Sequence, residues 1–279
     1  MYTYKIYNNI SAEGIDCLEV NGFTKEEKNP DALLIRSQFI NEGDFKKSLK
    51  CICRAGAGVN HIPIDMATER GVVVFNTPGG NANAVKELVI CGLLLSSRGI
   101  IQGHQFAQTL SSQDANELTH LVETNKKNFK GNELKGKTIG IIGLGAIGSL
   151  LAQSVVSMDM KVIGYDPNIS IDAAWQLPKE VVKADNLKDL LSNSDYISIH
   201  VPLVEETKNL ICNDVIKFIK PGAKLINLSR GSIVNNKDVL NALENKKIST
   251  FVTDFPSPEM VKRSIKFSDV ILLPHLGAS

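Results

Sequence analysis

The stretch that decides the fold is KTIGIIGLGAIGSLLAQSVVSMDMKVIGYDP, residues 137–167. An apolar run leads into a glycine turn from Gly143 to Gly148, a helical pattern follows, and a second apolar run ends at Asp166. A strand, a G-x-G-x-x-G turn, a helix and a second strand that ends in an acidic residue form the dinucleotide-binding βαβ unit. This stretch therefore predicts a Rossmann-type parallel sheet that binds a dinucleotide.

The residues of the turn each have a chemical reason to be there. We expect Gly143 to permit the tight turn, Gly145 to let the backbone approach a pyrophosphate, and Gly148 to let helix and strand pack closely. The pyrophosphate should lie at the helix start, at Ala146 and Ile147, because free N–H groups and the helix dipole favour an anion there.

The acidic residue at the end of the second strand distinguishes NAD from NADP. We expect Asp166 to accept hydrogen bonds from the adenosine ribose hydroxyls and to repel a 2′-phosphate. The next residues, Pro167 and Asn168, offer no cation that would bind such a phosphate. NAD is therefore the predicted cofactor.

The composition argues against several classes of protein. The chain has 279 residues, 31 basic and 30 acidic side chains and a formal net charge of +1. This length matches about two average domains, and the charge gives no reason to expect nucleic acid or an anionic membrane as partner. The N-terminus lacks the pattern of a signal peptide, and no apolar run reaches the roughly 18 residues of a membrane span.

The five cysteines are scattered along the chain. Cys51 and Cys53 form no C-x-x-C pair and no second pair follows them, so neither a metal site nor a disulfide is predicted. We expect buried, reduced thiols in a cytoplasmic protein.

Two series of apolar runs that alternate with helical patterns predict an α/β protein with two domains. We expect a smaller flavodoxin-like substrate domain over residues 1–92 and a doubly wound NAD-binding domain over 93–279. The connecting segment spans about 101–137 and is polar from Ser111 onward, while residues 84–108 have the pattern of one long apolar helix. The predicted strands are 3–8, 32–37, 51–56 and 71–76 in the first series and 137–143, 161–166, 180–184, 196–201, 223–229, 249–254 and 270–274 in the second.

Reactive side chains follow three strands of the second series. They are Arg230, Glu259, which lies five residues beyond Asp254, and His275. Ligands in open α/β sheets bind beyond the carboxyl ends of the strands, so these side chains should face one crevice. A histidine such as His275 suits proton transfer because its unperturbed pKa lies near neutrality, and an arginine such as Arg230 suits bidentate binding of a carboxylate.

These motifs, with HVPLVEETKNLI at 200–211, resemble the D-isomer-specific 2-hydroxy acid dehydrogenases over nearly the whole chain. RAGAGVNHIPID (54–65), ATERGVVVFNTPGGNANAVKELV (67–89) and VTDFPSPE (252–259) resemble more narrowly the short D-3-phosphoglycerate dehydrogenases of serine biosynthesis. The resemblance implies NAD-dependent oxidation of 3-phospho-D-glycerate to 3-phosphohydroxypyruvate. Two alternatives stay open: another D-2-hydroxy acid dehydrogenase, for hydroxypyruvate, glyoxylate or D-lactate, and an NAD-sensing protein like the corepressors related to this family.

The resemblance also implies roles for individual residues. His275 is the acid/base, Glu259 holds its far imidazole nitrogen, Arg230 binds the substrate carboxylate, and Asp254 contacts the nicotinamide carboxamide. The implied cofactor contacts are Gly143, Gly145, Ala146, Ile147, Gly148, Tyr165, Asp166, His200, Val201, Pro202, Thr207, Leu228, Ser229, Asp254 and Gly277. The expected substrate contacts are Arg36, Arg54, Ala57, Gly58 and Asn81.

The glycine-rich loop after the third predicted strand is the centre of the expected substrate side. The backbone N–H groups of Gly56, Ala57 and Gly58 would form an anion nest for a carboxylate. Lys86, near the start of the long helix, is hypothesised to add positive charge for a phosphorylated substrate.

The same resemblance carries two expectations about the larger context. Family members pair through their cofactor domains, so we expect a homodimer. In the family a helix follows the PHLGAS motif and returns to the first domain, so we expect a fragment that lacks this helix and binds NAD better than it turns over substrate.

Overall fold

The computed structural model describes residues 2–8, 10–110 and 114–277. The chain divides into two compact units, residues 1–81 and 82–279, and each is described by itself. Among the described residues, helices that could span a membrane are absent.

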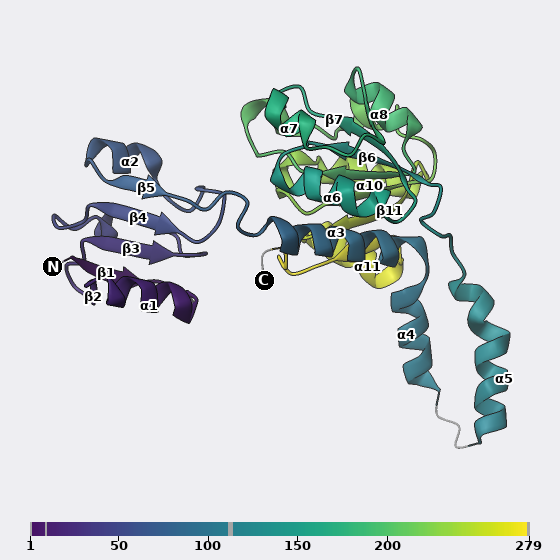
Figure 1. Cartoon of the computed structure of the whole chain (residues 1–279). Coiled ribbons are helices and arrows are strands. Elements are labelled where there is room, and N and C mark those ends of the chain that lie inside the picture. The colour runs from purple at the N-terminus through teal and green to yellow at the C-terminus, as the bar shows by residue number, and fades with distance from the viewer. Residues whose placement is uncertain (1, 9, 111–113, 278–279) are drawn as a thin grey trace. The chain divides into compact units, whose positions relative to one another are not determined.

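The first unit contains a five-stranded parallel sheet in the order β2-β1-β3-β4-β5 (Figure 1). This is the flavodoxin-like order, and the predicted fold of this unit is confirmed. The short strand β2 escaped prediction because two polar residues carry no hydrophobic alternation. The elements are β1 (Thr3–Ile6), α1 (Ala12–Val20), β2 (Thr24–Lys25), β3 (Ala32–Ile35), η1 (Glu42–Asp44), β4 (Cys51–Arg54), α2 (Ile64–Glu69) and β5 (Val73–Phe75).

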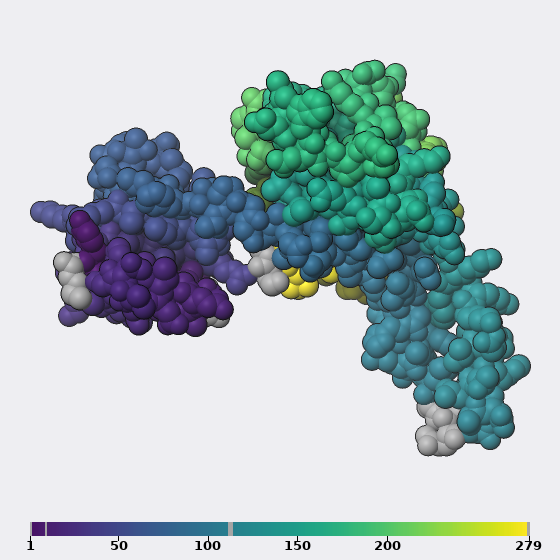
Figure 2. Space-filling view, in the orientation of Figure 1, coloured from purple at the N-terminus to yellow at the C-terminus, as the bar shows by residue number. Residues whose placement is uncertain are grey.

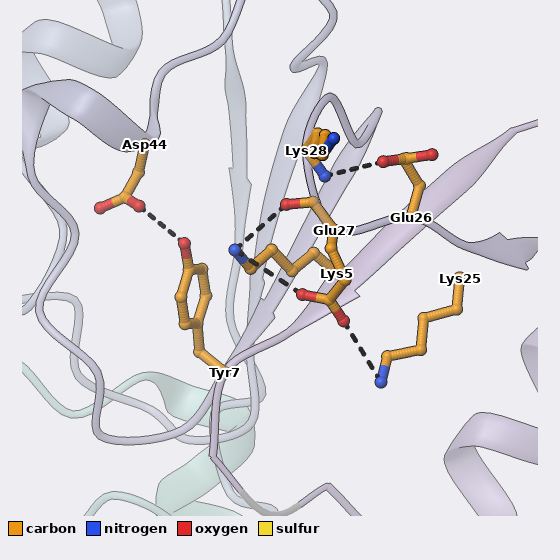
Figure 3. Close-up of polar contacts among 7 residues, drawn as sticks. All are labelled: Lys5, Tyr7, Lys25, Glu26, Glu27, Lys28 and Asp44. Carbon is orange, nitrogen blue, oxygen red and sulfur yellow. Dashed lines mark hydrogen bonds and ion pairs between the residues drawn. The ribbon is translucent and has the colours of Figure 1, made fainter.

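One face of this sheet is packed into an apolar cluster. Leu33, Ile35 and Ile52 are at most 1% exposed and belong to that cluster. A polar group on the same face joins β1 to later loops: the Lys5 ammonium donates to the Glu27 carbonyl at 3.2 Å, and the Tyr7 hydroxyl donates to Asp44 at 2.7 Å (Figure 3). Burial and the bond to Asp44 raise the pKa of Tyr7.

The other face, which we call the open face, is only partly covered by the described residues. Register pairs Leu34 with Cys53 and Cys53 with Phe75, and likewise Cys51 with Val73, so these five side chains share it. Val73 and Phe75 are 54% and 55% exposed. Parallel sheets in α/β proteins are normally buried on both faces, so this face departs from the usual pattern.

The second unit contains a seven-stranded parallel sheet in the order β12-β11-β10-β9-β6-β7-β8, which confirms the doubly wound sheet. The chain runs outward from β6 to β8 and then returns to build β9 to β12 on the other side. The strand order thus reverses between β6 and β9, which makes a switch point where such sheets bind ligands. The strands are β6 (Thr138–Ile142), β7 (Lys161–Tyr165), β8 (Val181–Lys183), β9 (Tyr196–Ile199), β10 (Ala223–Asn227), β11 (Ile248–Thr253) and β12 (Val270–Leu272).

Both faces of this larger sheet are buried. Leu225 and Ile226 are successive residues of β10, and they belong to different apolar clusters on the two faces. Phe251 and Val252 of β11 divide in the same way. The helices of the unit are α3 (Ala82–Ser97), α4 (Ile100–Thr109), α5 (Ala115–Asn125), η2 (Lys126–Phe129), α6 (Ala146–Val156), α7 (Ile171–Trp175), α8 (Leu187–Asn193), η3 (Glu205–Thr207), α9 (Asn213–Ile216), η4 (Gly231–Ile233), α10 (Asn236–Glu244) and α11 (Pro258–Lys266).

The division between the units falls at the start of α3. Val85, Val89 and Leu93 of this helix are buried in the larger unit, and a Cβ at Gly92 would meet Val252 at 3.3 Å. The boundary drawn from the sequence after residue 92 therefore lies inside a helix whose whole length packs on the second sheet.

The expected long helix over 84–108 is two helices. The break falls at Gly99, whose N–H donates to the carbonyl of Phe129 at 3.1 Å, so the chain turns where it meets another segment. The following region, expected as a polar connection, contains α5. Asp114 is the N-cap of this helix, because its carboxylate accepts the N–H groups of Asn116 and Glu117. Ser111, where we placed the polar run, lies outside the described residues.

The thiols differ from expectation in their burial. The five cysteines are free, but Cys17 and Cys91 are exposed and the other three are half-buried. Cys51 and Cys53 lie on the open face of the first sheet, which explains why these strand residues are not part of a core.

Candidate active site

The carboxyl ends of six strands of the larger sheet lie in one row. Register pairs the last residue of each strand with the last residue of its neighbour. From β7 to β12 the row crosses five gaps between strands, about 24 Å at roughly 4.8 Å each. The row consists of Tyr165, Ile142, Ile199, Asn227, Thr253 and Leu272. Most of the predicted cofactor and catalytic residues of this unit lie within the three residues that follow one of these six positions.

The glycine turn after β6 is locked by two close backbone approaches. A Cβ at Gly148 would lie 2.0 Å from the carbonyl oxygen of Gly143, and a Cβ at Gly143 would lie 2.6 Å from the carbonyl oxygen of His200. Gly143 also has φ +92°, a conformation that favours glycine. By contrast, space is open beside Gly145 among the described atoms. The turn therefore places bare backbone at the N-terminus of α6, as a pyrophosphate requires.

Asp166 closes the turn from the side of β7. One carboxylate oxygen accepts the N–H of Leu144 at 2.9 Å, and the other accepts the N–H of Asn168 at 3.0 Å. The carboxylate is half-buried and each oxygen keeps a lone pair for a further donor. These contacts fit a cofactor ribose beside Asp166.

His200, at the end of β9, is held as a neutral imidazole. Burial lowers its pKa to about 4. Its Nε2 lies 2.8 Å from the hydroxyl oxygen of Ser198, and within the described part of the chain its Nδ1 has no hydrogen-bond partner. A neutral ring beside the glycine turn suits a wall of the cofactor site and not a general acid.

A small hydrogen-bonded turn presents Arg230 beyond β10. The buried side chain of Asn227 accepts the N–H of Ser229 at 3.1 Å and donates to the carbonyl of Arg230 at 2.9 Å. The Ser229 hydroxyl donates to the carbonyl of Ile199 at 2.8 Å, which fixes the turn to β9. Burial lowers the pKa of Arg230, although a guanidinium stays charged at neutral pH.

The charge of Arg230 is available for a ligand. Its guanidinium donates to the carbonyl of Ser229 at 2.6 Å, and the ion pairs of the described residues do not include it. A half-buried, unpaired guanidinium at the end of a parallel strand is suited to bidentate binding of a carboxylate.

Asp254 and Gly277 form one unit of the site. Asp254 is 1% exposed, and its two oxygens accept the N–H groups of Leu276 and Gly277, each at 2.8 Å. The loop after β12 is thus tied to the end of β11.

His275 lies on that loop and its ring is exposed. It contacts Phe255 edge-on, with ring centroids 5.2 Å apart, and Phe255 also packs 3.2 Å from the place of a Cβ on Gly231. Phe255 therefore stands between the His275 loop and the Arg230 turn, a position that no sequence motif indicated.

Glu259 lies in the first turn of α11 and is exposed. Its carboxylate accepts the Ser257 hydroxyl at 3.0 Å, and in the described structure no hydrogen bond joins it to His275. Hydrogen bonds from its own backbone N–H and from Ser257 lower its pKa, so it is ionised at neutral pH. The expected pairing of Glu259 with His275 is not formed in this structure.

The remaining predicted cofactor residues lie in the row or in the elements next to it. Thr207 binds within its own loop: its hydroxyl accepts the N–H of Val204 at 2.9 Å and donates to the carbonyl of Pro202 at 2.6 Å. Leu228 is buried in the apolar cluster beneath α3. Tyr165 ends β7, Val201 continues β9, and Ala146 and Ile147 begin α6.

Four of the predicted substrate residues lie at or just beyond the carboxyl ends of β3 and β4 in the first unit: Arg36, Arg54, Ala57 and Gly58. Arg54 ends β4, and its Nε donates to the carbonyl of Arg36, just after β3, at 3.1 Å. The loop that follows is joined to Thr77: Gly56 donates its N–H to the Thr77 hydroxyl at 2.7 Å. The prediction that the Gly56 N–H belongs to an anion nest is therefore wrong, because this N–H is already hydrogen-bonded.

The other two donors of that nest differ. The N–H groups of Ala57 and Gly58 donate to no other described residue, while the Ala57 carbonyl accepts the side chain of Asn76 at 2.7 Å. Asn81 is the last residue of the first unit, and Lys86 lies in α3, where its ammonium donates to Asn83 at 2.6 Å. Apart from Lys86, the predicted substrate residues thus lie in one unit and the predicted catalytic residues in the other.

Two cavities of the larger unit lie away from the row. One of about 130 Å³ is lined by Lys137, Asp195 and Lys224 among others, at the amino ends of β6, β9 and β10. Another of about 240 Å³ is lined by Arg98 and Asp269 among others, below α3. Both lie at the amino ends of the strands, on the opposite edge of the sheet from the glycine turn. The candidate site is therefore identified by the residue types along the row and not by a cavity. Metal-binding clusters are not found among the described residues.

Known proteins are similar to this chain in sequence. Residues 93–277 match the family model of the D-isomer specific 2-hydroxyacid dehydrogenases, NAD binding domain. The D-3-phosphoglycerate dehydrogenase of Methanocaldococcus jannaschii is 35% identical over 268 residues, 92% of this chain and 48% of that protein. The enzyme of that name from Bacillus subtilis is 37% identical over 254 residues, 89% of this chain and 46% of that protein. The chain thus spans about half the length of the curated relatives it matches.

A solved structure agrees in fold. The NAD⁺-bound 3-phosphoglycerate dehydrogenase of Entamoeba histolytica has a TM-score of 0.77 and 23% identity, over 99% of this chain and 88% of that one.

Proposed function

The chain belongs to the D-isomer specific 2-hydroxyacid dehydrogenase family, and from that premise we propose that it oxidises 3-phospho-D-glycerate to 3-phosphohydroxypyruvate with NAD. This is the first step of phosphorylated serine biosynthesis. The observation that carries the proposal is the single row of strand ends, which presents the glycine turn, Arg230 and His275 along one edge. The relatives that bear the name D-3-phosphoglycerate dehydrogenase support this substrate over other 2-hydroxy acids.

The cofactor is held by residues of the larger unit alone. NAD, when bound, supplies the hydride acceptor, and the residues present fit it: open backbone at Gly145 for the pyrophosphate and the Asp166 carboxylate for the ribose. The Nδ1 of His200, which has no hydrogen-bond partner among the described residues, would offer the cofactor a further polar contact.

The chain's own residues handle the substrate carboxylate and the proton. Arg230 donates two parallel hydrogen bonds to the substrate carboxylate. Its positive charge stabilises the ionised carboxylate next to the reacting carbon. His275 accepts the hydroxyl proton as a general base, and the face or edge of Phe255 limits the positions of its ring. We propose that Glu259 turns from Ser257 to the imidazole in the loaded protein, a side-chain rotation that exposed residues make in picoseconds to nanoseconds.

The first unit supplies the phosphate end in this proposal. The free N–H groups of Ala57 and Gly58, with Arg54 directly before that loop, are the donors that a phosphorylated anion requires. Arg36 and Asn81 complete the proposed set.

An initial-rate screen tests the substrate and the cofactor together. 3-Phospho-D-glycerate, D-glycerate, glycolate and D-lactate are each assayed with NAD and with NADP. We expect the highest kcat/KM with 3-phospho-D-glycerate and NAD. A higher kcat/KM with an unphosphorylated acid would assign another dehydrogenase activity, and tight NAD binding without turnover of any acid would favour an NAD sensor.

We also propose a homodimer formed through the NAD-binding domain. α4 and α5 project from the rest of the larger unit (Figures 1 and 2), and neither helix contains a buried residue. Ile100, Leu118 and Val122 on them are 45%, 37% and 41% exposed. Helices this short need tertiary packing, which a second copy would provide. Light scattering should give twice the chain mass, and the double change Leu118→Lys with Val122→Lys should give a monomer.

A cytoplasmic location is the last part of the proposal. Five free thiols, two of them exposed, fit a reducing compartment. Cell fractionation checks it, and recovery with a membrane or secreted fraction would contradict it.

A further inference from the structure

The buried carboxylate of Asp254 accepts hydrogen bonds from the backbone that directly follows His275. Asp254 is 1% exposed, and its Oδ1 and Oδ2 accept hydrogen bonds from two successive residues, Leu276 and Gly277, both at 2.8 Å. One side chain at the end of β11 thereby fixes two consecutive peptide units beyond β12.

The backbone at His275 needs such support. Its φ is +57°, in the left-handed region that a residue with a side chain rarely adopts. Conformations of this kind persist where the surrounding structure determines them. The imidazole itself is exposed and its described contact is the edge of Phe255, so the ring is placed mainly by its backbone.

We propose that Asp254 is a positioning residue, which sets the direction of the His275 imidazole through the N–H groups of Leu276 and Gly277. This deepens the proposed function and rests on it, because His275 is the general base there. It differs from the carboxamide contact implied by resemblance, since it operates in the chain without any cofactor.

The chemistry of the contact admits no substitute for the carboxylate. An ionised carboxylate only accepts hydrogen bonds, as two N–H donors demand. Asparagine offers one accepting oxygen, and its NH₂ group would face the second N–H donor. At Gly277, a Cβ would lie 3.2 Å from Oδ2 of Asp254, so alanine there presses on the same contact.

We call the two hydrogen bonds from Leu276 and Gly277 to Asp254 the anchor. Hydrogen exchange of backbone amides in the cofactor-free protein tests it. For Asp254→Asn we expect the amide of Leu276 or Gly277 to exchange at least about tenfold faster, the change that loss of one hydrogen bond produces. The His275 ring resonances should shift in the same spectra. Unchanged exchange at both amides overturns the proposal.

Asp195→Asn is the matched control. This carboxylate accepts the N–H of Thr138 at 2.9 Å, but at the amino end of β9, on the opposite edge of the sheet. It should leave exchange at Leu276 and Gly277 unchanged; a similar acceleration there would mean general loosening of the sheet and would overturn the assignment. Gly277→Ala tests the contact from the other side, and covers the case in which Asp254→Asn does not fold.

Kinetics separates positioning from cofactor contact. We expect Asp254→Asn to lower kcat about 10²-fold, the cost of a small misplacement of a reacting group, with the NAD dissociation constant changed less than about twofold. Weakened NAD binding with normal amide exchange would identify a cofactor contact and overturn the proposal. If the unaltered chain turns over no 2-hydroxy acid, the proposed function fails, while amide exchange and the His275 resonances still decide the anchor.

Discussion

The two sheets of this chain follow one parallel plan but are covered differently. In the seven-stranded sheet, the successive residues Leu225 and Ile226 are both 0% exposed, because each face has its own apolar cluster. In the five-stranded sheet, Leu33 is buried on one face while Val73 and Phe75 remain more than half exposed on the other.

The two sheets should differ both in hydrophobic stabilisation and in how firmly the loops at their carboxyl edges are held. Apolar surface that stays in water adds nothing to the hydrophobic free energy of folding. The loops at the carboxyl edge also differ: in the larger sheet they are tied by side chains such as Asn227 and Asp254, and in the smaller by the contacts of Thr77. We therefore expect changes in the larger unit to have the larger effects.

The strongest contrast should come from one phenylalanine in each sheet. Phe251→Ala removes a side chain that is 1% exposed and should lower the unfolding free energy of the larger unit by about 3–5 kcal/mol. Phe75→Ala acts on the open face and should change stability by no more than about 0.5 kcal/mol. Urea unfolding followed by circular dichroism measures both; equal losses would remove the distinction between the sheets.

Arginines at the two carboxyl edges provide the next contrast. Arg230→Gln should lower kcat/KM about 10²–10³-fold, because a charged donor to the substrate carboxylate is lost, while NAD affinity is retained. Arg54→Gln should mainly raise the KM for the phosphorylated acid. Steady-state kinetics and NAD titration measure these effects, and near-normal turnover by Arg230→Gln would refute its role.

Acid should destabilise the two units in different pH windows. The folded pKa of His200 is about 4, below the roughly 6.5 of an unfolded histidine, so the unfolded chain binds this proton first. The larger unit should therefore lose up to about 3 kcal/mol as pH falls from about 6.5 to 4.

In the smaller unit the group is a carboxyl. The Lys50 and Thr3 hydrogen bonds lower the pKa of Asp31 to about 2, so its contribution is present above about pH 4 and disappears as pH falls towards 2. Urea unfolding at several pH values tests both windows. His200→Phe is the control: it should flatten the window between pH 6.5 and 4, and an unchanged pH dependence in this variant would contradict the assignment.

The smallest expected effect concerns cofactor choice. Asp166→Ala should weaken NAD binding about tenfold and reduce the preference over NADP, because the ribose acceptor and the negative charge are both lost. Arg54→Gln, in the other unit, is the control and should leave NAD affinity unchanged. If selectivity survives in Asp166→Ala, the carboxylate does not set it.

Much of this architecture could be predicted because its signals are local. The apolar runs and the G-x-G-x-x-G turn defined β6, α6 and β7, and their parallel connection followed from the helices between the strands. β2 was missed since two polar residues carry no period, and the break at Gly99 was missed since it depends on the approach of Phe129. The cap of α5 was readable: Asp114 followed by Glu117 is a helix-start signal.

The site could be predicted only as far as residue types. Arg230 and His275 were selected from their strand ends, but the supports beneath them were not. Asn227, buried under the Arg230 turn, and Phe255, beside His275, become visible only when neighbouring strands are in register. The pairing of Glu259 with Ser257 likewise depends on how the first turn of α11 is capped, which the spacing of motifs does not determine.

The anchor at Asp254 also has a consequence for the order of events during synthesis. The backbone contacts that shape the nucleotide turn are complete once His200 has emerged, because its N–H donates to the carbonyl of Ile142. Gly277, whose N–H makes the second hydrogen bond to Asp254, follows 77 residues later. At roughly 5–20 residues per second, a nascent chain therefore carries the elements of its nucleotide turn for several seconds before the loop of His275, the proposed general base, can be held in place.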